Sequence, residues 1–177
     1  PVRLPVREFE SNRSQRRSLT RHVNMTALER PLTYREEHYQ LYQRYQAARH
    51  SGGGMDQGDA EQYAEFLLTS HVTTLMVEFR EPSMGEQQGL LRMVSVIDQI
   101  GDGLSAVYTF YTPEPGLNLG TFNVMWQIEL AKALDLKYLY LGYWIKDSAK
   151  MAYKTRFRPH ELFLNGVWTA AQSHRSC

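Results

Sequence analysis

The spacing of apolar side chains divides the chain into helical and extended segments. In residues 33–49 apolar positions recur every three or four residues, and Thr33 with Glu36 matches a capping box, so we expect a helix there. Tyr39 lies off its apolar stripe and is a weak candidate for a ligand contact. The stripe is predicted to contain Tyr34, His38, Leu41, Tyr42, Tyr45 and Ala48.

The pattern then changes from helical spacing to alternation. Residues 59–70 predict a second helix, capped by Asp59. From Thr73 apolar and polar side chains alternate with a period of two, which is typical of strands. Residues 90–100 and 104–111 are predicted to form two further strands. The glycine-rich turn between them joins them as a hairpin, so we expect an antiparallel meander.

A largely apolar helix is predicted to follow the meander. It begins after Asn118-Leu119-Gly120-Thr121, where Asn118 is expected to act as a cap, and it ends near Leu136. Its few polar residues share one arc, so we expect most of its surface to be buried against a sheet. Residues 138–141 have the length and bulk of a buried strand, which Gly142 interrupts. Residues 161–168 predict a closing hairpin.

The first 30 residues are locally basic. Residues 2–9 alternate weakly and predict a first strand, and residues 11–17 are predicted to form a polar loop. Arginine suits phosphate binding because its planar guanidinium donates to two oxygens at once. An exposed basic loop without a ligand remains the alternative. The arginines are Arg3, Arg7, Arg13, Arg16, Arg17, Arg21 and Arg30.

Composition bounds the classes of function. The chain has 177 residues and a net charge of +1, which fits a single domain and gives no bulk charge for nucleic-acid binding. Cys177 is the only cysteine, so a disulfide framework and a cysteine metal site are excluded and a reducing compartment is expected. There is no membrane-spanning run, and the glycines of residues 51–58 lack the context of a phosphate-binding loop.

The candidate chemistry is concentrated in residues 138–159. Asp147 or Ser148 is a plausible helix cap, and on such a helix Asp147, Lys150 and Lys154 share one face. A strand end, a glycine and a helix start with two lysines direct N–H groups and positive charge at an anion. The structural alternative is a solvated lysine face beside aromatic residues that belong to the core.

This stretch resembles the carboxy-terminal domain of the aminoacyl-tRNA–protein transferases, which include arginyltransferases and bacterial aspartate/glutamate leucyltransferases. Trp144 and residues 146–148 are more similar to the leucyltransferase branch, and Asn118 stands where the family usually has Ser. The matching motifs are Gly142-Tyr143-Trp144-Ile145, Lys150-Met151-Ala152-Tyr153-Lys154, Phe157 with Pro159, and Arg13-Ser14-Gln15-Arg16-Arg17.

The resemblance implies an α+β acetyltransferase-like (GNAT) fold, with a mixed, mostly antiparallel sheet flanked by helices. A gap between residues 108–111 and 138–143 would hold the acyl donor. The implied reaction moves leucine or arginine from aminoacyl-tRNA to the α-amino group of a protein with N-terminal Asp or Glu, in the N-end rule pathway of the cytoplasm. No cofactor, metal or membrane is implied. Family members carry an amino-terminal cysteine-containing region, so residues 1–177 are expected to be one catalytic domain of a longer protein.

The resemblance also suggests roles for individual residues. Lys150, Tyr153, Lys154 and Asp147 are the catalytic candidates, although Asp147 as a plain helix cap is an equal alternative. Two other functions stay open, an acyl-coenzyme A-dependent N-acyltransferase and a non-catalytic reader of acidic protein N-termini. The substrate-binding candidates are Arg16, Arg17, Tyr111, Asn118, Gly120, Thr121, Tyr143 and Trp144.

Overall fold

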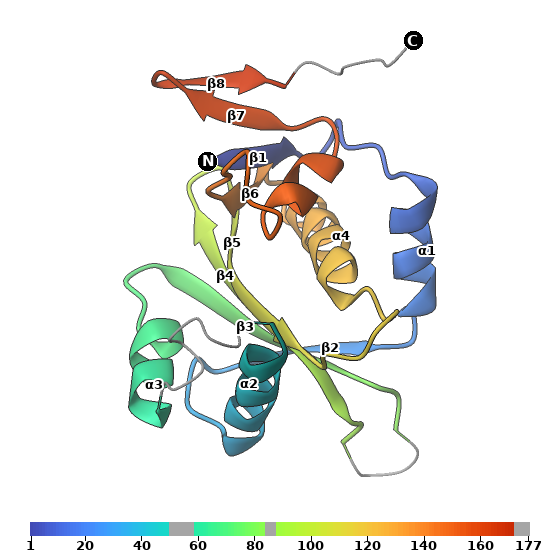
Figure 1. The fold of residues 1–177 in the computed structure, drawn as a ribbon, viewed down its shortest axis with the longest axis vertical. Helices are drawn as coiled ribbons and strands as arrows, with labels where there is room; N and C mark the ends of the chain where they lie inside the picture. The colour runs from blue at the N-terminus through green and yellow to red at the C-terminus, as the bar shows by residue number, and fades with distance from the viewer. Residues whose placement is uncertain (50–58, 84–87, 172–177) are drawn as a thin grey trace.

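One mixed sheet forms the centre of the protein. A computed structural model describes residues 1–49, 59–83 and 88–171, and within them eight strands pair in the order β2-β3-β4-β5-β6-β1-β7-β8 (Figure 1). Only β5 and β6 pair in parallel, so the predicted mixed and mostly antiparallel sheet is confirmed. The strands are β1 (Val2–Pro5), β2 (Thr26–Arg30), β3 (Thr73–Arg80), β4 (Leu91–Ile100), β5 (Gly103–Tyr111), β6 (Tyr138–Gly142), β7 (Glu161–Leu164) and β8 (Val167–Ala170).

Helices cover both faces of this sheet. α4 packs on one face, whereas α2 and α3 pack on the other, which gives an α+β protein of three layers (Figure 1). None of the described helices has the length and apolar character needed to cross a membrane. The helices are α1 (Arg13–Arg21), α2 (Glu36–Arg49), α3 (Ala60–Leu68), α4 (Leu119–Ala133) and the short 3-10 helix η2 (Ala152–Arg156).

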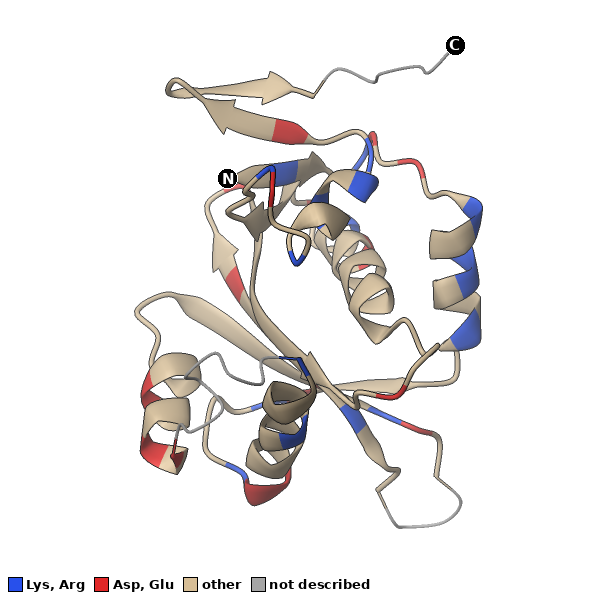
Figure 2. Cartoon of the chain, in the orientation of Figure 1, with Lys and Arg blue, Asp and Glu red and all other residues tan. Residues whose placement is uncertain are grey.

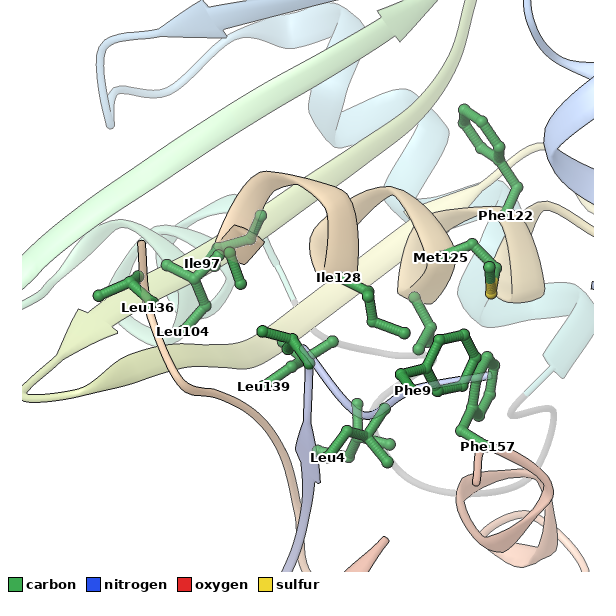
Figure 3. Close-up of a cluster of buried hydrophobic side chains, with 14 of the residues drawn as sticks. Leu4, Phe9, Ile97, Leu104, Phe122, Met125, Ile128, Leu136, Leu139 and Phe157 are labelled. Carbon is green, nitrogen blue, oxygen red and sulfur yellow. The ribbon is translucent and has the colours of Figure 1, made fainter. Parts of the chain in front are cut away.

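The main core lies between α4 and the sheet. Alternation along β3 sends Val77 toward α4 and Met76 toward α2 and α3, so both faces of the strand are buried. Figure 3 shows side chains of α4 against residues from several strands. Each large side chain buried in this way contributes roughly 1.5–3 kcal/mol. The labelled residues are Leu4, Phe9, Ile97, Leu104, Phe122, Met125, Ile128, Leu136, Leu139 and Phe157.

A buried charge network fixes the start of α2 to the sheet. Glu78 of β3 is fully buried and accepts hydrogen bonds from Arg80 at 2.8 Å, His38 at 2.7 Å and Arg30 at 3.1 Å. Burial alone would raise the pKa of Glu78, but these hydrogen bonds outweigh it and lower the pKa to about 2. Glu78 is therefore an ionised carboxylate that joins α2, β2 and β3.

The predicted start of α2 was wrong by two residues. The helix begins at Glu36, and the Tyr39 amide donates to the Arg35 carbonyl, so Thr33 is not its cap. The Glu36 carboxylate instead accepts from the Tyr34 hydroxyl at 2.7 Å, which leaves Tyr34 exposed rather than inward. Of the other stripe residues, His38, Leu41 and Tyr42 are buried, Tyr45 is half-buried, and Ala48 is exposed.

The cap of α3 is confirmed. The Asp59 side chain accepts from the Gln62 amide at 2.9 Å, as the sequence predicted. The helix ends at Leu68, close to the predicted end near Ser70. Tyr39, off the predicted stripe of α2, packs against Tyr63 of α3 with ring centroids 5.4 Å apart. The glycine-rich residues 51–58 lie outside the described residues.

Residues 11–17 do not form the predicted polar loop. Most of them belong to α1, where Asn12 and Gln15 make a reciprocal capping box. The buried face of α1 contains the polar residues Gln15 and Ser18, whose side chains donate to backbone carbonyls elsewhere in the chain. Because the buried positions are polar, hydrophobic periodicity gave no sign of the helix.

Candidate functional site

The separation of β5 from β6 opens a cleft. The two strands pair only from Gly103, Leu104 and Ser105 to Tyr138, Leu139 and Tyr140. Beyond these pairs the strands border a cleft of about 920 Å³, in the predicted gap. Its other walls come from the end of α2, the loop at residues 112–118, the start of α4, and η2.

A β-bulge decides which side chains face this cleft. Ile97 pairs with Ala106 and Val96 with Tyr108, so Val107 is an extra, unpaired residue in β5. One extra residue moves all later side chains to the opposite face. Thr109 and Tyr111 consequently lie against α4, where Thr109 accepts from Asn123 at 2.9 Å.

The start of α4 has no side-chain cap. Asn118 adopts the left-handed conformation with φ of 55°, and its side chain makes no capping hydrogen bond, so the predicted cap was wrong. Its carbonyl accepts from the Phe122 amide at 3.0 Å, so the backbone of Asn118 begins the helix. The amides of Leu119, Gly120 and Thr121 have no carbonyl one turn earlier, and these residues line the cleft. This end of α4 is suited to an anion or a developing negative charge.

Tyr111 connects the start of α4 to α2. A Cβ on Gly120 would lie 3.0 Å from the Tyr111 hydroxyl oxygen, so only glycine fits without a shift. Arg49 donates from Nη2 to this hydroxyl at 3.1 Å, and the Tyr45 ring lies 4.9 Å from the Tyr111 ring. The sequence placed Tyr111 and Gly120 in the site but missed Arg49 and Tyr45, for which the only signal was their i, i+4 spacing at the end of a helix.

Lys154 holds the end of β6. Gly142 has φ of +77°, which favours glycine, and Lys154 Nζ donates to the Tyr143 carbonyl at 2.6 Å. Burial lowers the pKa of Lys154. Burial, together with the nearby Tyr111, raises the pKa of the Tyr153 phenol, which therefore stays protonated and able to donate. Tyr143, Tyr153 and Lys154 all line the cleft.

The predicted helix at Asp147 is absent. Residues 146–151 form turns, in which the Ser148 amide donates to the Ile145 carbonyl at 3.1 Å, and η2 follows. Asp147 and Lys150 therefore do not share a helical face with Lys154. Both are exposed, and neither is among the described residues that line the cleft. Trp144 is half-buried against the main core and does not line the cleft either.

α1 supports the loop that leads into α4. Ser18 donates to the Asn118 carbonyl at 3.3 Å, and a ring nitrogen of His22 lies 2.7 Å from the Leu117 carbonyl oxygen. Arg16 and Arg17 point outward and are exposed. Figure 2 shows basic residues along the length of α1, so the helix presents a positive ridge beside the start of α4.

Charge in the cleft is sparse. Among the described residues that line it, the charged ones are Arg49, Lys154 and Glu114. Glu114 accepts from Arg92 Nη1 at 2.6 Å and is therefore already paired. The remaining lining is mostly apolar, aromatic or small, with the backbone amides at the start of α4 as additional donors.

Comparison with known families places this geometry in context. Residues 37–164 match the family model described as "Arginine-tRNA-protein transferase, C terminus". The chain belongs to this family. The matched range of the transferase model contains the end of α2, β5, the start of α4 and η2, which together surround the cleft, whereas α1 precedes it.

Curated relatives are similar to this chain along most of its length. It is 54% identical over 169 residues to the aspartate/glutamate leucyltransferase of Nitrosospira multiformis, covering 95% of this chain and 65% of that protein. It is 49% identical over 176 residues to the enzyme of the same name from Methylobacillus flagellatus, covering 99% of this chain and 68% of that protein. The chain thus spans about two thirds of the length of these relatives.

A solved structure supports the fold of the chain. It is similar to the structure of L-PGS from Bacillus licheniformis with a TM-score of 0.62 and 10% sequence identity. The likeness covers 96% of this chain and 57% of that chain. At this level of identity the likeness concerns the fold alone.

Proposed function

We propose that this chain is the catalytic domain of an aminoacyltransferase that moves leucine from leucyl-tRNA to proteins with N-terminal Asp or Glu. One observation carries the proposal: a cleft opens between β5 and β6 at the uncapped start of α4 in a chain of the arginine-tRNA-protein transferase family. The leucyltransferase names of the curated relatives favour leucine. The reaction marks proteins for degradation in the N-end rule pathway of the cytoplasm, where charged tRNA is found.

The cleft suits the 3′ end of a charged tRNA. Its volume of about 920 Å³ lies in the range of small-molecule sites and is large enough for an adenosine with its amino acid. The free amides at Gly120 and Thr121 bind the terminal phosphate or ribose region. A parallel strand pair that separates beside a helix start also supports the acetyltransferase-like (GNAT) fold, with the donor in the gap.

The chemistry is aminolysis of an activated ester. The acceptor's α-amine attacks the ester carbonyl carbon, an amide bond forms, and the ribose oxygen leaves and takes up a proton as the amine loses one. The amine has a pKa of roughly 7.7–8.0, so part of it is neutral near pH 7.5 without a dedicated base. Positioning supplies much of the rate. The protonated Tyr153 phenol donates to the developing oxyanion.

Asp147 has no place in this scheme, because its exposed side chain lies outside the cleft lining. Lys154 positions the Tyr143 backbone and adds positive charge beside the terminal phosphate. Tyr143 shapes the aminoacyl pocket from the cleft wall, whereas Trp144 supports that wall from the core. The exposed Lys150 and the α1 ridge, with Arg16 and Arg17, bind tRNA outside the cleft.

The charge of the cleft favours leucine over arginine. An arginyl side chain needs a free carboxylate, and the one carboxylate among the described lining residues, Glu114, is paired with Arg92. A leucyl side chain needs apolar contacts, which the lining provides at Val107, Val124 and Leu141.

The two alternatives make different demands. An acyl-coenzyme A enzyme needs a Gln/Arg-x-x-Gly-x-Gly/Ala segment to bind pyrophosphate, and Asn118-Leu119-Gly120-Thr121 does not provide it. A non-catalytic reader of acidic N-termini needs positive charge but no donor cleft.

Incubation with radiolabelled leucyl-tRNA or arginyl-tRNA and a peptide beginning with Asp tests the proposal. Label should move from leucyl-tRNA to the Asp peptide, and far less to the same peptide with an acetylated amino terminus. Acetyl transfer from acetyl-coenzyme A without tRNA would support the first alternative, and peptide binding without any transfer would support the second. Either result would contradict the proposal.

A further inference from the structure

We propose that Arg49 recognises the acidic side chain of the acceptor's first residue, an inference that rests on the function proposed above. The acceptor must bring its α-amine to the ester while its neighbouring carboxylate is bound by a positive group. For Asp and Glu the amine and the carboxylate are only a few bonds apart, so this positive group must lie in the cleft itself. Arg49 lines the cleft at the end of α2.

Arg49 is held in place by Tyr111, and no carboxylate among the described residues neutralises it. Its Nη2 donates to the Tyr111 hydroxyl at 3.1 Å, and its guanidinium carbon lies 5.6 Å from the centre of the Tyr111 ring. Among the described residues it forms no ion pair with a carboxylate, in contrast to Arg30, Arg80 and Arg92. A guanidinium donates five N–H groups, so binding Tyr111 leaves donors for a carboxylate.

Lys154, the other cation among the described cleft residues, is less suited to this role. Its Nζ is committed to the Tyr143 carbonyl at 2.6 Å, and a single ammonium lacks the planar fork that binds both oxygens of a carboxylate. The lysine therefore stabilises the end of β6, and the arginine remains available.

The distribution of charge over the described helices favours a peptide carboxylate over tRNA phosphate at Arg49. α3, which packs beside α2, contains Glu61 and Glu65, is capped by Asp59, and has no Lys or Arg. Figure 2 shows acidic residues on α3 and at the start of α2, the end of that helix opposite Arg49, whereas the basic ridge lies on α1. The basic residues suited to a polyanion are thus concentrated on α1, whereas a single carboxylate inside the cleft can bind Arg49.

The test measures transfer and binding in parallel. In the purified protein, Arg49→Ala should lower kcat/KM for an Asp-initial peptide about 10- to 100-fold, the range expected for a charge-assisted pair. The slow transfer to the matching Asn-initial peptide and the KM for leucyl-tRNA should not change. Arg49→Lys, which keeps the charge, should recover part of the loss. Arg44→Ala is the matched control, since Arg44 is an exposed arginine of α2 outside the described cleft lining.

Direct binding separates this inference from the proposed reaction. Fluorescence anisotropy of labelled Asp-initial and Asn-initial peptides requires no transfer, so a loss of Asp preference in Arg49→Ala would support the assignment even in an inactive protein. An unchanged preference for Asp in the variant would overturn it. A rise confined to the KM of leucyl-tRNA would overturn it as well, and would assign Arg49 to tRNA. Circular dichroism checks that each variant is folded.

Discussion

Tyr111 contacts residues from two helices that line the cleft, α2 and α4. Its hydroxyl accepts from Arg49 and lies against Gly120, and its ring contacts Tyr45. Its proximity also contributes to the raised pKa of Tyr153. A side chain added at Gly120, which lies against the hydroxyl, should therefore affect the cleft through Tyr111.

Gly120→Ala should disturb this arrangement without unfolding the protein. The new Cβ would lie 3.0 Å from the Tyr111 hydroxyl oxygen, so the phenol or the start of α4 must shift. Displacements of this kind at a reaction centre reduce activity about 10- to 100-fold, which we expect in kcat/KM for leucyl transfer. The change in thermal midpoint should be small.

A double-mutant cycle provides the control for Gly120→Ala. Tyr111→Phe removes the nearest atom, and the next ring carbon lies 3.5 Å from the Cβ position, which is an ordinary contact. Gly120→Ala combined with Tyr111→Phe should thus be no worse than Tyr111→Phe alone. Additive losses would show that the Tyr111 hydroxyl is not the source of the effect.

Tyr153→Phe should reduce kcat while preserving substrate binding. The phenol is proposed to donate to the oxyanion, and removal of one such donor costs about 100-fold or more in kcat. Single-turnover transfer at saturating leucyl-tRNA and peptide measures the effect. Tyr138→Phe, outside the described cleft lining, is the matched control. Equal kcat in Tyr153→Phe and wild type would remove the hydroxyl from the mechanism.

At the scale of elements, the unexpected feature is α1. Its buried side chains are polar: Ser18 binds a carbonyl of the loop before α4, and Gln15 binds the Arg156 carbonyl of η2. Arg13, Arg16 and Arg17 are exposed on its other side. The helix therefore positions the start of α4 with one face and presents positive charge with the other.

Replacing Arg13, Arg16 and Arg17 together by Ala should weaken the binding of tRNA but not the binding of the peptide. We expect a higher KM for leucyl-tRNA, an unchanged KM for the peptide, and a shallower dependence of tRNA affinity on salt. Each lost phosphate contact should reduce the slope of log affinity against log salt by about 0.7–0.9. Filter binding at several salt concentrations measures this, with Arg44→Ala as control. An unchanged slope would exclude α1 from the tRNA interface.

At the scale of the whole molecule, the folding stability depends on the ion network that joins α2 to the sheet. The pKa of Glu78 is about 2, below the ordinary value for a glutamate. The ionised side chain therefore stabilises the folded state at any pH above the pKa that Glu78 has in the unfolded chain. This contribution is lost as the pH falls toward 2. It amounts to roughly 3 kcal/mol if the whole shift arises on folding.

Glu78→Gln should therefore destabilise the protein most at neutral pH. Removing the carboxylate leaves Arg80 and Arg30 near each other without their shared partner, and breaking such a buried pair costs about 3–5 kcal/mol. Urea unfolding at pH 7 and pH 3 measures the free energy, and the deficit of the variant should shrink at the lower pH. Glu61→Gln on exposed α3 is the control. An equal loss of unfolding free energy at pH 7 and pH 3 would show that the ionisation of Glu78 does not cause the destabilisation.

The sequence by itself determined the meander, the presence of a helix after it, the closing hairpin and the family signature, because each rests on local periodicity, turn residues or a motif. The helix was predicted from after Thr121 to about Leu136 and is observed at Leu119–Ala133. Gly120, Tyr143, Tyr153 and Lys154 were placed in the site from that signature and Tyr111 from the gap that the resemblance implies, and all of them line one cleft. Lys150 and Asp147 were grouped with them by an assumed helix that the chain does not form, and Trp144, placed there by the motif, packs against the core instead.

Only the tertiary structure decided how these parts meet. Val107 is an extra residue in β5, and it turns Thr109 and Tyr111 toward α4. A bulge is defined by the register of β5 against β4, so the pattern within β5 does not reveal it. The polar side chains of α1 likewise bind partners that are distant in sequence, and so does Arg49, which binds Tyr111. These partners lie about 60 to 140 residues away. Such contacts are set by the packing of whole elements, which side-chain periodicity along one segment does not encode.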